Sequence, residues 1–347
     1  MHLEMSPLRI SALALGFVLA LPVPVPAAEL EEGELSDGAL LDRAPVHLDE
    51  AALASLEGRR PGIGKALGQV ELSAITYRSD GLRVRGYLAV PRDTVPRDTV
   101  PRDAGEGKTG KLPCVIFNRG GNREFGALSD ARAAAILAPL AQRGYVAVAS
   151  QYRGNGGGEG REEFGGAEVA DVLALIPLLE FLEEADPSRI GMFGWSRGGL
   201  MTYLALRRTD RIRAAIVGAG VSDAFDAIER RPEMETHVLA ELVPGWPETR
   251  DEALRARSPI FWAGELHKAT PVLLLHGSAD WRVHPSQALR MASALYEAKH
   301  PFRFVFFEGG DHGLSEHRAE VDRLVHGWLD RYVRDGEPWP SLEPHGR

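Results

Sequence analysis

Short apolar segments alternate with amphipathic segments along the chain from residue 112 onward. Short, continuously apolar segments are typical of strands that are buried on both faces of a sheet. They predict strands over residues 112–117, 145–150, 190–193, 212–217, 271–276 and 302–307. The amphipathic segments predict helices over residues 131–143, 167–184, 198–207, 286–299 and 319–333. This alternation predicts an α/β fold, with a mostly parallel sheet and helices on both faces.

The segments before the first of these strands predict an antiparallel hairpin. Residues 70–77 and 82–90 are rich in β-forming residues and flank a Ser-Asp-Gly turn. A weakly patterned lead-in over residues 29–69 predicts a short helix at residues 49–56. Residues 91–111 repeat the sequence Pro-Arg-Asp-Thr-Val. Regularly spaced prolines are incompatible with a helix or a central strand, so we interpret this segment as a surface loop.

Residues 1–28 have the pattern of a secretory signal peptide. Arg9 precedes an apolar run over residues 10–21, and Ala27 and Ala28 offer a small-residue cleavage site. We therefore expect an exported protein, periplasmic or extracellular, whose mature chain has no membrane span. A buried helix or a membrane anchor is the alternative interpretation, although the run is short for a span.

Composition excludes several classes of protein. The chain has 347 residues, 44% of them hydrophobic and 26% charged, which is typical of a globular protein. The net charge is -9 and no cluster of Lys and Arg stands out, so we expect no nucleic-acid partner. Cys114 is the only cysteine, so no intrachain disulfide can form. No histidine pair has the spacing of metal ligands, and we expect neither a metal nor another cofactor.

The strongest chemical signal is the sequence Gly-Trp-Ser-Arg-Gly-Gly over residues 194–199. It joins a predicted strand to a predicted helix, which is the context of a nucleophile elbow. Glycines on both sides of Ser196 permit a tight turn, and the turn exposes the serine hydroxyl at the edge of the sheet. We predict that Ser196 is a nucleophile.

A nucleophilic serine needs a base, and the base needs an acid that orients it. In the α/β-hydrolase fold these residues follow in the order Ser, acid, His. Asp280 follows the strand predicted at residues 271–276, and His312 follows the strand predicted at residues 302–307. Both lie at carboxyl ends of strands, where ligand-facing residues gather. We therefore predict a triad of Ser196, Asp280 and His312.

Other residues compete for these roles. Asp223 also follows a predicted strand and is an alternative acid. Asp311 is the immediate neighbour of the predicted base and is badly placed to bond its ring. His276 and His284 are alternative bases, but His276 fits a buried strand end and neither lies in a glycine-rich loop.

A tetrahedral intermediate needs backbone N–H donors for its oxyanion. We assign one to Arg197, the residue after the nucleophile. The other is expected from Gly120 or Gly121, in the loop that follows the strand predicted at residues 112–117. Glycine lets the backbone approach a ligand closely. An ordinary loop is the alternative interpretation of these glycines.

These motifs resemble the catalytic domain of the prolyl oligopeptidase family of serine peptidases. The resemblance includes Tyr-Arg-Ser-Asp-Gly at residues 77–81, Gln-Tyr-Arg-Gly at residues 151–154 and His-Gly-Ser-Ala-Asp at residues 276–280, and it covers residues 70–335. It implies an α/β-hydrolase fold, an acyl-enzyme mechanism and peptide substrates. The chain reads Arg-Gly-Gly-Asn at residues 119–122 where relatives often have His-Gly-Gly-Pro. The lead-in is also too short for the β-propeller of many relatives, so the resemblance supports the triad more than the substrate.

Residues 222–268 are a predicted helical insert, either a lid over the nucleophile or helices packed on the sheet. Trp246 and Trp262 in this insert, together with Trp195, are candidate substrate-binding residues. Residues 336–347 form a C-terminal tail.

The sequence thus predicts a serine hydrolase that cleaves small peptides. A carboxylesterase acting on small acyl esters is the alternative within this class. A non-catalytic binding protein on a hydrolase fold is the alternative of another class, and the intact Ser, Asp and His argue against it. Glu162 and Glu163, near the same edge of the sheet, fit a solvated turn.

Overall fold

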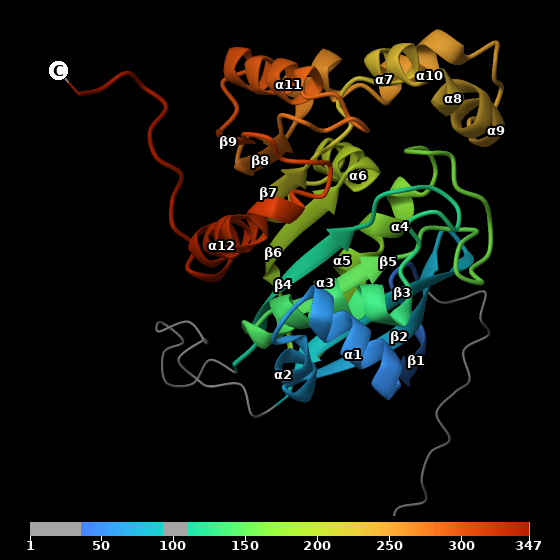
Figure 1. The fold of residues 1–347 in the computed structure, drawn as a ribbon, viewed down its shortest axis with the longest axis vertical. Coiled ribbons are helices and arrows are strands. Elements are labelled where there is room, and N and C mark those ends of the chain that lie inside the picture. Colours follow the sequence, from blue (N-terminus) through green and yellow to red (C-terminus); the bar gives the residue numbers. More distant parts are fainter. Residues whose placement is uncertain (1–35, 93–109, 347) are drawn as a thin grey trace, which may run out of the picture. The chain divides into compact units, whose positions relative to one another are not determined.

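The computed structural model describes residues 36–92 and 110–346. The expected signal peptide, residues 1–28, and most of the repeat-containing loop at residues 91–111 lie outside the described residues. Among these described residues, nine strands form one sheet in the order β1-β2-β3-β5-β4-β6-β7-β8-β9, and Figure 1 shows its twist. The strands are β1 Leu40–Pro45, β2 Val70–Ser79, β3 Leu82–Pro91, β4 Leu112–Asn118, β5 Val146–Ser150, β6 Ala185–Trp195, β7 Ile212–Gly218, β8 Val272–Gly277 and β9 Phe302–Phe307.

The sheet is antiparallel at its N-terminal end and parallel elsewhere. β1, β2, β3 and β5 pair antiparallel in turn, whereas β5, β4, β6, β7, β8 and β9 form a parallel array. Asp80 and Gly81 close the β2–β3 hairpin with φ of 48° and 77°. Two consecutive positive φ values suit the tight turn of a two-residue hairpin. The predicted mixed sheet of an α/β-hydrolase fold is confirmed.

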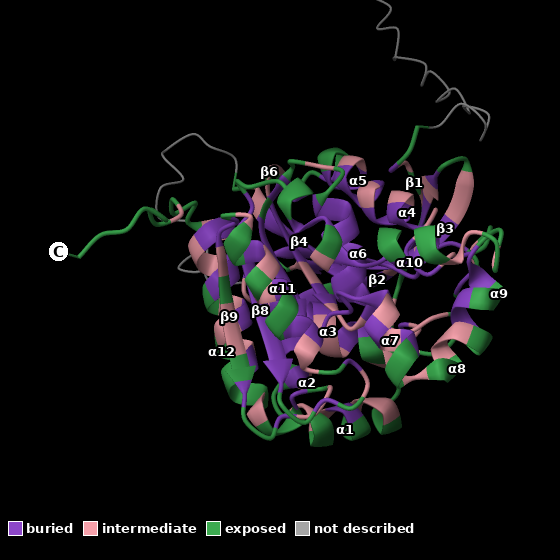
Figure 2. Cartoon of the chain, turned by 90° about the horizontal axis from the view of Figure 1, so that it is seen from above, coloured by how far each residue is buried: buried purple, intermediate pink, exposed green. Residues whose placement is uncertain are grey.

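Helices cover both faces of the sheet, and alternate residues of the strands point to each layer. On β4, Cys114 and Ile116 belong to one buried cluster, and Val115 and Phe117 belong to the other. Figure 2 shows the central strands as largely buried, whereas the edge strand β9 is mostly exposed or half-buried. One face packs against α1 Glu50–Arg59, α2 Ile63–Gly68, α3 Asp130–Gln142 and α12 Arg318–Leu329. The other packs against α4 Val169–Leu173, α5 Leu175–Phe181, α6 Arg197–Leu206 and α11 Ser286–Glu297.

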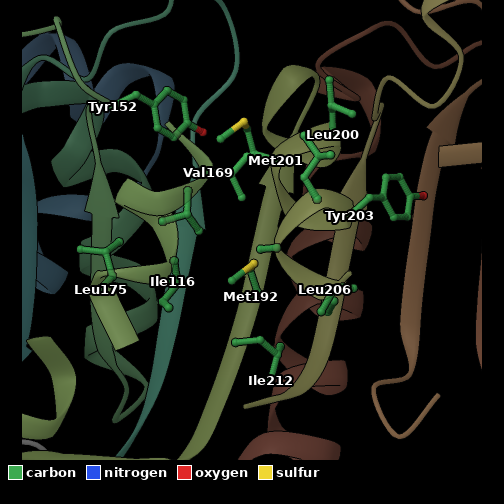
Figure 3. Close-up of a cluster of buried hydrophobic side chains, with 14 of the residues drawn as sticks. Ile116, Tyr152, Val169, Leu175, Met192, Leu200, Met201, Tyr203, Leu206 and Ile212 are labelled. Atoms are coloured by element: carbon green, nitrogen blue, oxygen red, sulfur yellow. The ribbon is translucent and has the colours of Figure 1, made fainter. Parts of the chain in front are cut away.

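Close packing on the second face fixes α6, which follows Ser196. Figure 3 shows the buried cluster that includes Ile116 and Met192 of the sheet and Leu200 and Met201 of α6. All four side chains are fully buried. Burial of apolar surface contributes about 25 cal/mol per Å² to stability. These contacts therefore hold the first turns of α6 against the sheet.

The residues 222–268 are helical, as predicted, and consist of short pieces. These are α7 Ala224–Arg230, α8 Pro232–Met234, a π turn at Glu235–Leu239, α9 Ala240–Leu242, α10 Arg250–Ala256 and the 3-10 turns Pro259–Phe261 and Ala263–Glu265. Figure 1 shows α7 and α10 on the same side of the sheet as α11.

Two boundaries differ from the predicted ones for identifiable reasons. The helix predicted at residues 167–184 is interrupted between α4 and α5. Pro177 cannot donate to the carbonyl of Leu173, where α4 ends, and its ring clashes with that carbonyl. The helix predicted at residues 319–333 ends at Leu329 and continues as a π turn, Asp330–Arg334. Among the described residues, no helix is long and apolar enough to span a membrane.

Because α3 packs into the core, shortening one of its buried side chains should lower the free energy of unfolding considerably. Leu137 is fully buried, so Leu137→Ala should lower the free energy of unfolding by about 3 kcal/mol. Leu289, on α11, is 51% exposed, and Leu289→Ala should change it by less than about 0.5 kcal/mol. Urea unfolding monitored by circular dichroism measures both values. Equal losses in the two variants would contradict the assignment of the core.

Candidate active site

Ser196 lies in the tight turn between β6 and α6. Its backbone has φ 59° and ψ -124°, a strained conformation for a residue with a side chain and one that suits a nucleophile elbow. A Cβ on Gly194 would lie 2.0 Å from the carbonyl oxygen of Gly198, and a Cβ on Gly198 would lie 1.9 Å from that of Asn118. The turn can therefore form only because both flanking positions are glycine.

The imidazole of His312 contacts the carboxylate of Asp280. His312 Nδ1 lies 2.8 Å from Asp280 Oδ2, and Asp280 is buried. Asp280 follows β8 and His312 follows β9, and these two strands are parallel neighbours in the sheet. When Nδ1–H donates to the carboxylate, Nε2 is left as a proton acceptor.

Three further donors hold the Asp280 carboxylate. Oδ1 accepts the N–H groups of Arg282 at 2.8 Å and Val283 at 3.0 Å. His276 Nε2 lies 3.3 Å from Oδ2 and 2.9 Å from the carbonyl oxygen of Val283. Burial alone would raise the pKa of Asp280, but hydrogen bonds from His276 and His312 outweigh it and hold that pKa well below its usual range. Asp280 is therefore ionised at neutral pH.

Ser196 and His312 line one cavity of about 540 Å³, together with Gly120, Gly121 and Trp195. Trp195 Nε1 donates to the backbone carbonyl oxygen of His312 at 2.9 Å. The glycine loop passes close to the serine, because a Cβ on Gly120 would lie 3.7 Å from Ser196 Oγ. The fold thus brings together three segments that are distant in sequence: Ser196 with the adjacent Trp195, His312, and the glycine pair.

The side chain of Arg197 is buried among aromatic and acidic groups. Its guanidinium carbon lies 5.0 Å from the ring centroid of Tyr152 and 4.8 Å from that of Phe164. It forms ion pairs with Glu162 and Glu168, both buried. The interpretation of Glu162 as part of a solvated turn is therefore wrong. An arginine directly after the serine, at the start of a buried helix, was the signal that acidic partners were needed.

The same cluster fixes the loop after β4. Arg197 donates to the carbonyl oxygen of Gly121 at 2.9 Å, and Arg119 donates to that of Gly120 at 3.2 Å. The Tyr152 hydroxyl donates to the carbonyl oxygen of Arg119 at 2.9 Å. The backbone of both glycines is thereby held by buried arginines, and sequence reasoning identified neither arginine side chain.

The other two predicted tryptophans lie away from the cavity. Trp262 is only 5% exposed, and its Nε1 donates to the carbonyl oxygen of Arg255 at 3.2 Å. The guanidinium of Arg207 covers its ring at 5.0 Å. Trp246 packs against the same apolar cluster. Of the two interpretations of the insert, helices packed on the sheet fits these two side chains.

The competing acids and bases have other contacts. Asp223 accepts the N–H of Phe225 at the start of α7 and pairs with Arg290 at 2.8 Å. Asp311 accepts the N–H of Gly313 at 2.9 Å. His284 is exposed and bonds a neighbouring serine. Within residues 36–92 and 110–346, no cluster of His, Cys, Asp and Glu has the arrangement of a metal site.

Comparison with known proteins places the chain among serine peptidases. The chain is 29% identical to the uncharacterized peptidase YtmA of Bacillus subtilis over 263 residues, which are 75% of this chain and 93% of that protein. It is 28% identical to the uncharacterized peptidase YuxL of the same organism, over 56% of this chain and 31% of that protein.

Solved structures agree in fold. An acylaminoacyl peptidase of Pyrococcus horikoshii matches 81% of this chain and 44% of its own with a TM-score of 0.64, at 24% identity. A puromycin-hydrolyzing peptidase of Mycobacterium tuberculosis matches 78% of this chain and 41% of its own with a TM-score of 0.62, at 27% identity. The chain thus spans less than half the length of these two structures.

The family model of the prolyl oligopeptidase family matches residues 132–336, which is more than half of the chain. The matched segment contains Ser196, Asp280 and His312. The chain therefore belongs to the prolyl oligopeptidase family of serine peptidases.

Proposed function

We propose that this protein is a serine peptidase that cleaves small peptides or aminoacyl amides through an acyl-enzyme, with Ser196 as nucleophile, His312 as base and Asp280 as the orienting acid. The observation that carries the proposal is the imidazole of His312, bound at 2.8 Å to a buried carboxylate and sharing a cavity with Ser196. This is the arrangement by which a neutral imidazole activates a hydroxyl.

The reaction proceeds in two halves. His312 Nε2 accepts the proton of Ser196 as Oγ attacks the carbonyl carbon of the scissile bond. The charge that develops on the imidazole is stabilised by Asp280. The imidazolium then gives its proton to the leaving amine, and the C–N bond breaks. In the second half, His312 takes a proton from the water that attacks the acyl-enzyme. His312 then returns this proton to Ser196 Oγ as the ester bond breaks and the acid is released.

Backbone N–H donors next to the serine are assigned to the oxyanion. The N–H of Arg197 opens α6, where the helix dipole favours negative charge. The loop of Gly120 and Gly121 supplies the second donor, and the buried arginines hold this loop in place. Such donors are effective because they need no reorganisation when charge develops.

The names of two similar solved structures support the proposal of small substrates. The Mycobacterium tuberculosis structure is named for hydrolysing puromycin, and the Pyrococcus horikoshii structure is an acylaminoacyl peptidase. A carboxylesterase would use the same serine and imidazole, so acyl esters and aminoacyl anilides must be assayed together. A higher kcat/KM on anilides than on esters of the same acyl group, each divided by its uncatalysed rate, supports the peptidase assignment.

Ser196→Ala removes the attacking oxygen and should lower kcat by at least about 10⁴-fold with the fold intact. A fluorophosphonate probe should label the wild-type protein and not the variant. Circular dichroism checks that the variant is folded. Near-normal turnover by the variant, or an unlabelled wild-type protein, would refute the nucleophile assignment.

Asp280→Asn should lower kcat by about 10⁴-fold, because the amide disturbs the tautomer of His312. The change should also make stability less dependent on pH. Since the folded pKa of Asp280 is below its usual value, its stabilising contribution is complete above the unfolded pKa of about 3.9 and is lost as the pH falls below it.

Urea unfolding of the wild type and of Asp280→Asn at about pH 6 and about pH 3.5 measures this contribution. The stability advantage of the wild type should be smaller at the lower pH. An advantage that is unchanged between the two pH values would contradict the assigned contacts of Asp280.

Gly120→Ala should lower kcat by about 10²-fold, since removal of one oxyanion donor has an effect of this size. The added methyl group would lie 2.9 Å from the carbonyl oxygen of Trp195 and 3.1 Å from Ser196 Cβ, so the loop must shift. Gly68→Ala is the matched control, because a Cβ at that position meets no atom within 4 Å. If both variants retain full kcat, the loop does not supply the donor.

A further inference from the structure

The cavity that contains Ser196 extends between two helices on one face of the sheet. Its floor is formed by Phe117 of β4 and Phe193 of β6. One wall is a face of α3 and the other is a face of α12. On each helix the lining residues are three or four positions apart, which places them on one face. The apolar positions of these walls include Ile136, Pro139, Val321 and Val325. Beyond the serine, the cavity is therefore a largely apolar slot that fits a hydrocarbon side chain.

Arginines dominate the charge of this slot. Arg60, Arg132, Arg282 and Arg318 line it, and the one carboxylate among its lining residues is Asp322, which is bonded to Arg60 at 3.3 Å. The chain as a whole has a net charge of -9. A local excess of positive charge in an acidic protein points to an anionic ligand, because clefts lined by one sign of charge attract the opposite sign.

Three of these guanidiniums have no acidic partner. Within the part of the chain that the structure describes, no carboxylate pairs with Arg132, Arg282 or Arg318. Arg282 instead lies between the rings of Phe125 and Trp281, at 5.4 Å and 4.9 Å. Because no carboxylate neutralises them, these three guanidiniums are available to a ligand.

The unpaired arginines lie at the same edge of the sheet as the nucleophile. Arg132 is in the first turn of α3 and Arg318 begins α12, and Arg282 follows Asp280 in the loop after β8. A helix that follows a parallel strand begins at the carboxyl edge of the sheet, where Ser196 also lies. The first turn of a helix disfavours a cation, so helix stability does not explain these positions.

We propose that the cavity binds the carboxy-terminal residue of a short peptide, with its apolar side chain in the slot between α3 and α12 and its free carboxylate at Arg132, Arg282 and Arg318. This proposal rests on the proposed function and specifies the substrate. Ser196 and His312 both line the cavity, and the residue bound there is assigned to the leaving side, next to the imidazole that gives its proton to the leaving amine. Attack by Ser196 Oγ then breaks the last peptide bond and releases an apolar amino acid with an intact carboxylate.

Binding to the inactive Ser196→Ala protein tests this specificity without any chemistry. The two probes are acetyl-Ala-Phe and acetyl-Ala-Phe amide, which differ only in the terminal charge, and calorimetry measures their affinities. The free acid should bind about tenfold more tightly than the amide, because hydrogen bonds to ionised groups are the strong ones. Equal affinities, or no binding of the acid, would overturn the proposal.

Arginine variants in the same Ser196→Ala background locate the carboxylate. Arg132→Gln combined with Arg318→Gln should reduce the preference for the acid over the amide to nearly one. Arg323→Gln is the control, because Arg323 is on α12 as well, is exposed and does not line the cavity. A preference that survives the double variant, or that is lost equally in the control, would overturn the assigned site.

The wild-type protein separates this proposal from the proposed function. It should release phenylalanine from acetyl-Ala-Phe with a higher kcat/KM than it releases phenylalanine amide from the amide. Hydrolysis of both at equal kcat/KM would overturn the carboxylate site and leave the peptidase assignment intact. Preferential binding of the acid without hydrolysis of either compound would refute the peptidase assignment and leave the site intact.

Discussion

The buried guanidinium of Arg197 is the contact on which the arrangement of the site depends. It joins the helix that follows Ser196 to the loop after β4 through the carbonyl oxygen of Gly121. It is compensated by Glu162 and Glu168, which belong to the segment before α4. Since breaking a buried ion pair by removing one partner costs about 3–5 kcal/mol, these segments can separate only at a large loss of stability. Three stretches that are distant in sequence therefore behave as one support.

A second set of contacts fixes Asp280 and His312, the proposed acid and base. Asp280 receives donors from its own loop, from the end of β8 and from the loop after β9. The carboxylate therefore has little freedom to turn, and its direction determines that of the His312 ring. Catalysis by proton transfer needs this positional accuracy more than it needs flexibility. The parallel order of β8 and β9 provides it, because neighbouring strands end at the same edge.

Much of the fold could be predicted from the sequence, because the strands of the parallel sheet are apolar throughout and are separated by helical segments. The strand β1, Leu40–Pro45, was missed because it is an edge strand whose residues are exposed or half-buried, and it carries no apolar run. The predicted serine, aspartate and histidine could be located because glycine-rich turns follow strands at each of them.

The contacts of long side chains could not be predicted in the same way. Arg197 and Glu162 are polar in sequence and buried in the structure, since their partners come from distant segments. Trp246 and Trp262 were assigned to substrate because aromatic residues serve equally in binding sites and in cores. Nothing in their local sequence distinguishes these roles, and only the folded chain places them in the core.

The hydrogen bond between Trp195 and the backbone of His312 has a consequence for motion. The indole belongs to the residue directly before the serine, so the strand that carries the nucleophile also holds the loop of the histidine. A displacement of one segment relative to the other therefore strains this hydrogen bond. Trp195 thus couples the turn that contains Ser196 to the loop that contains His312.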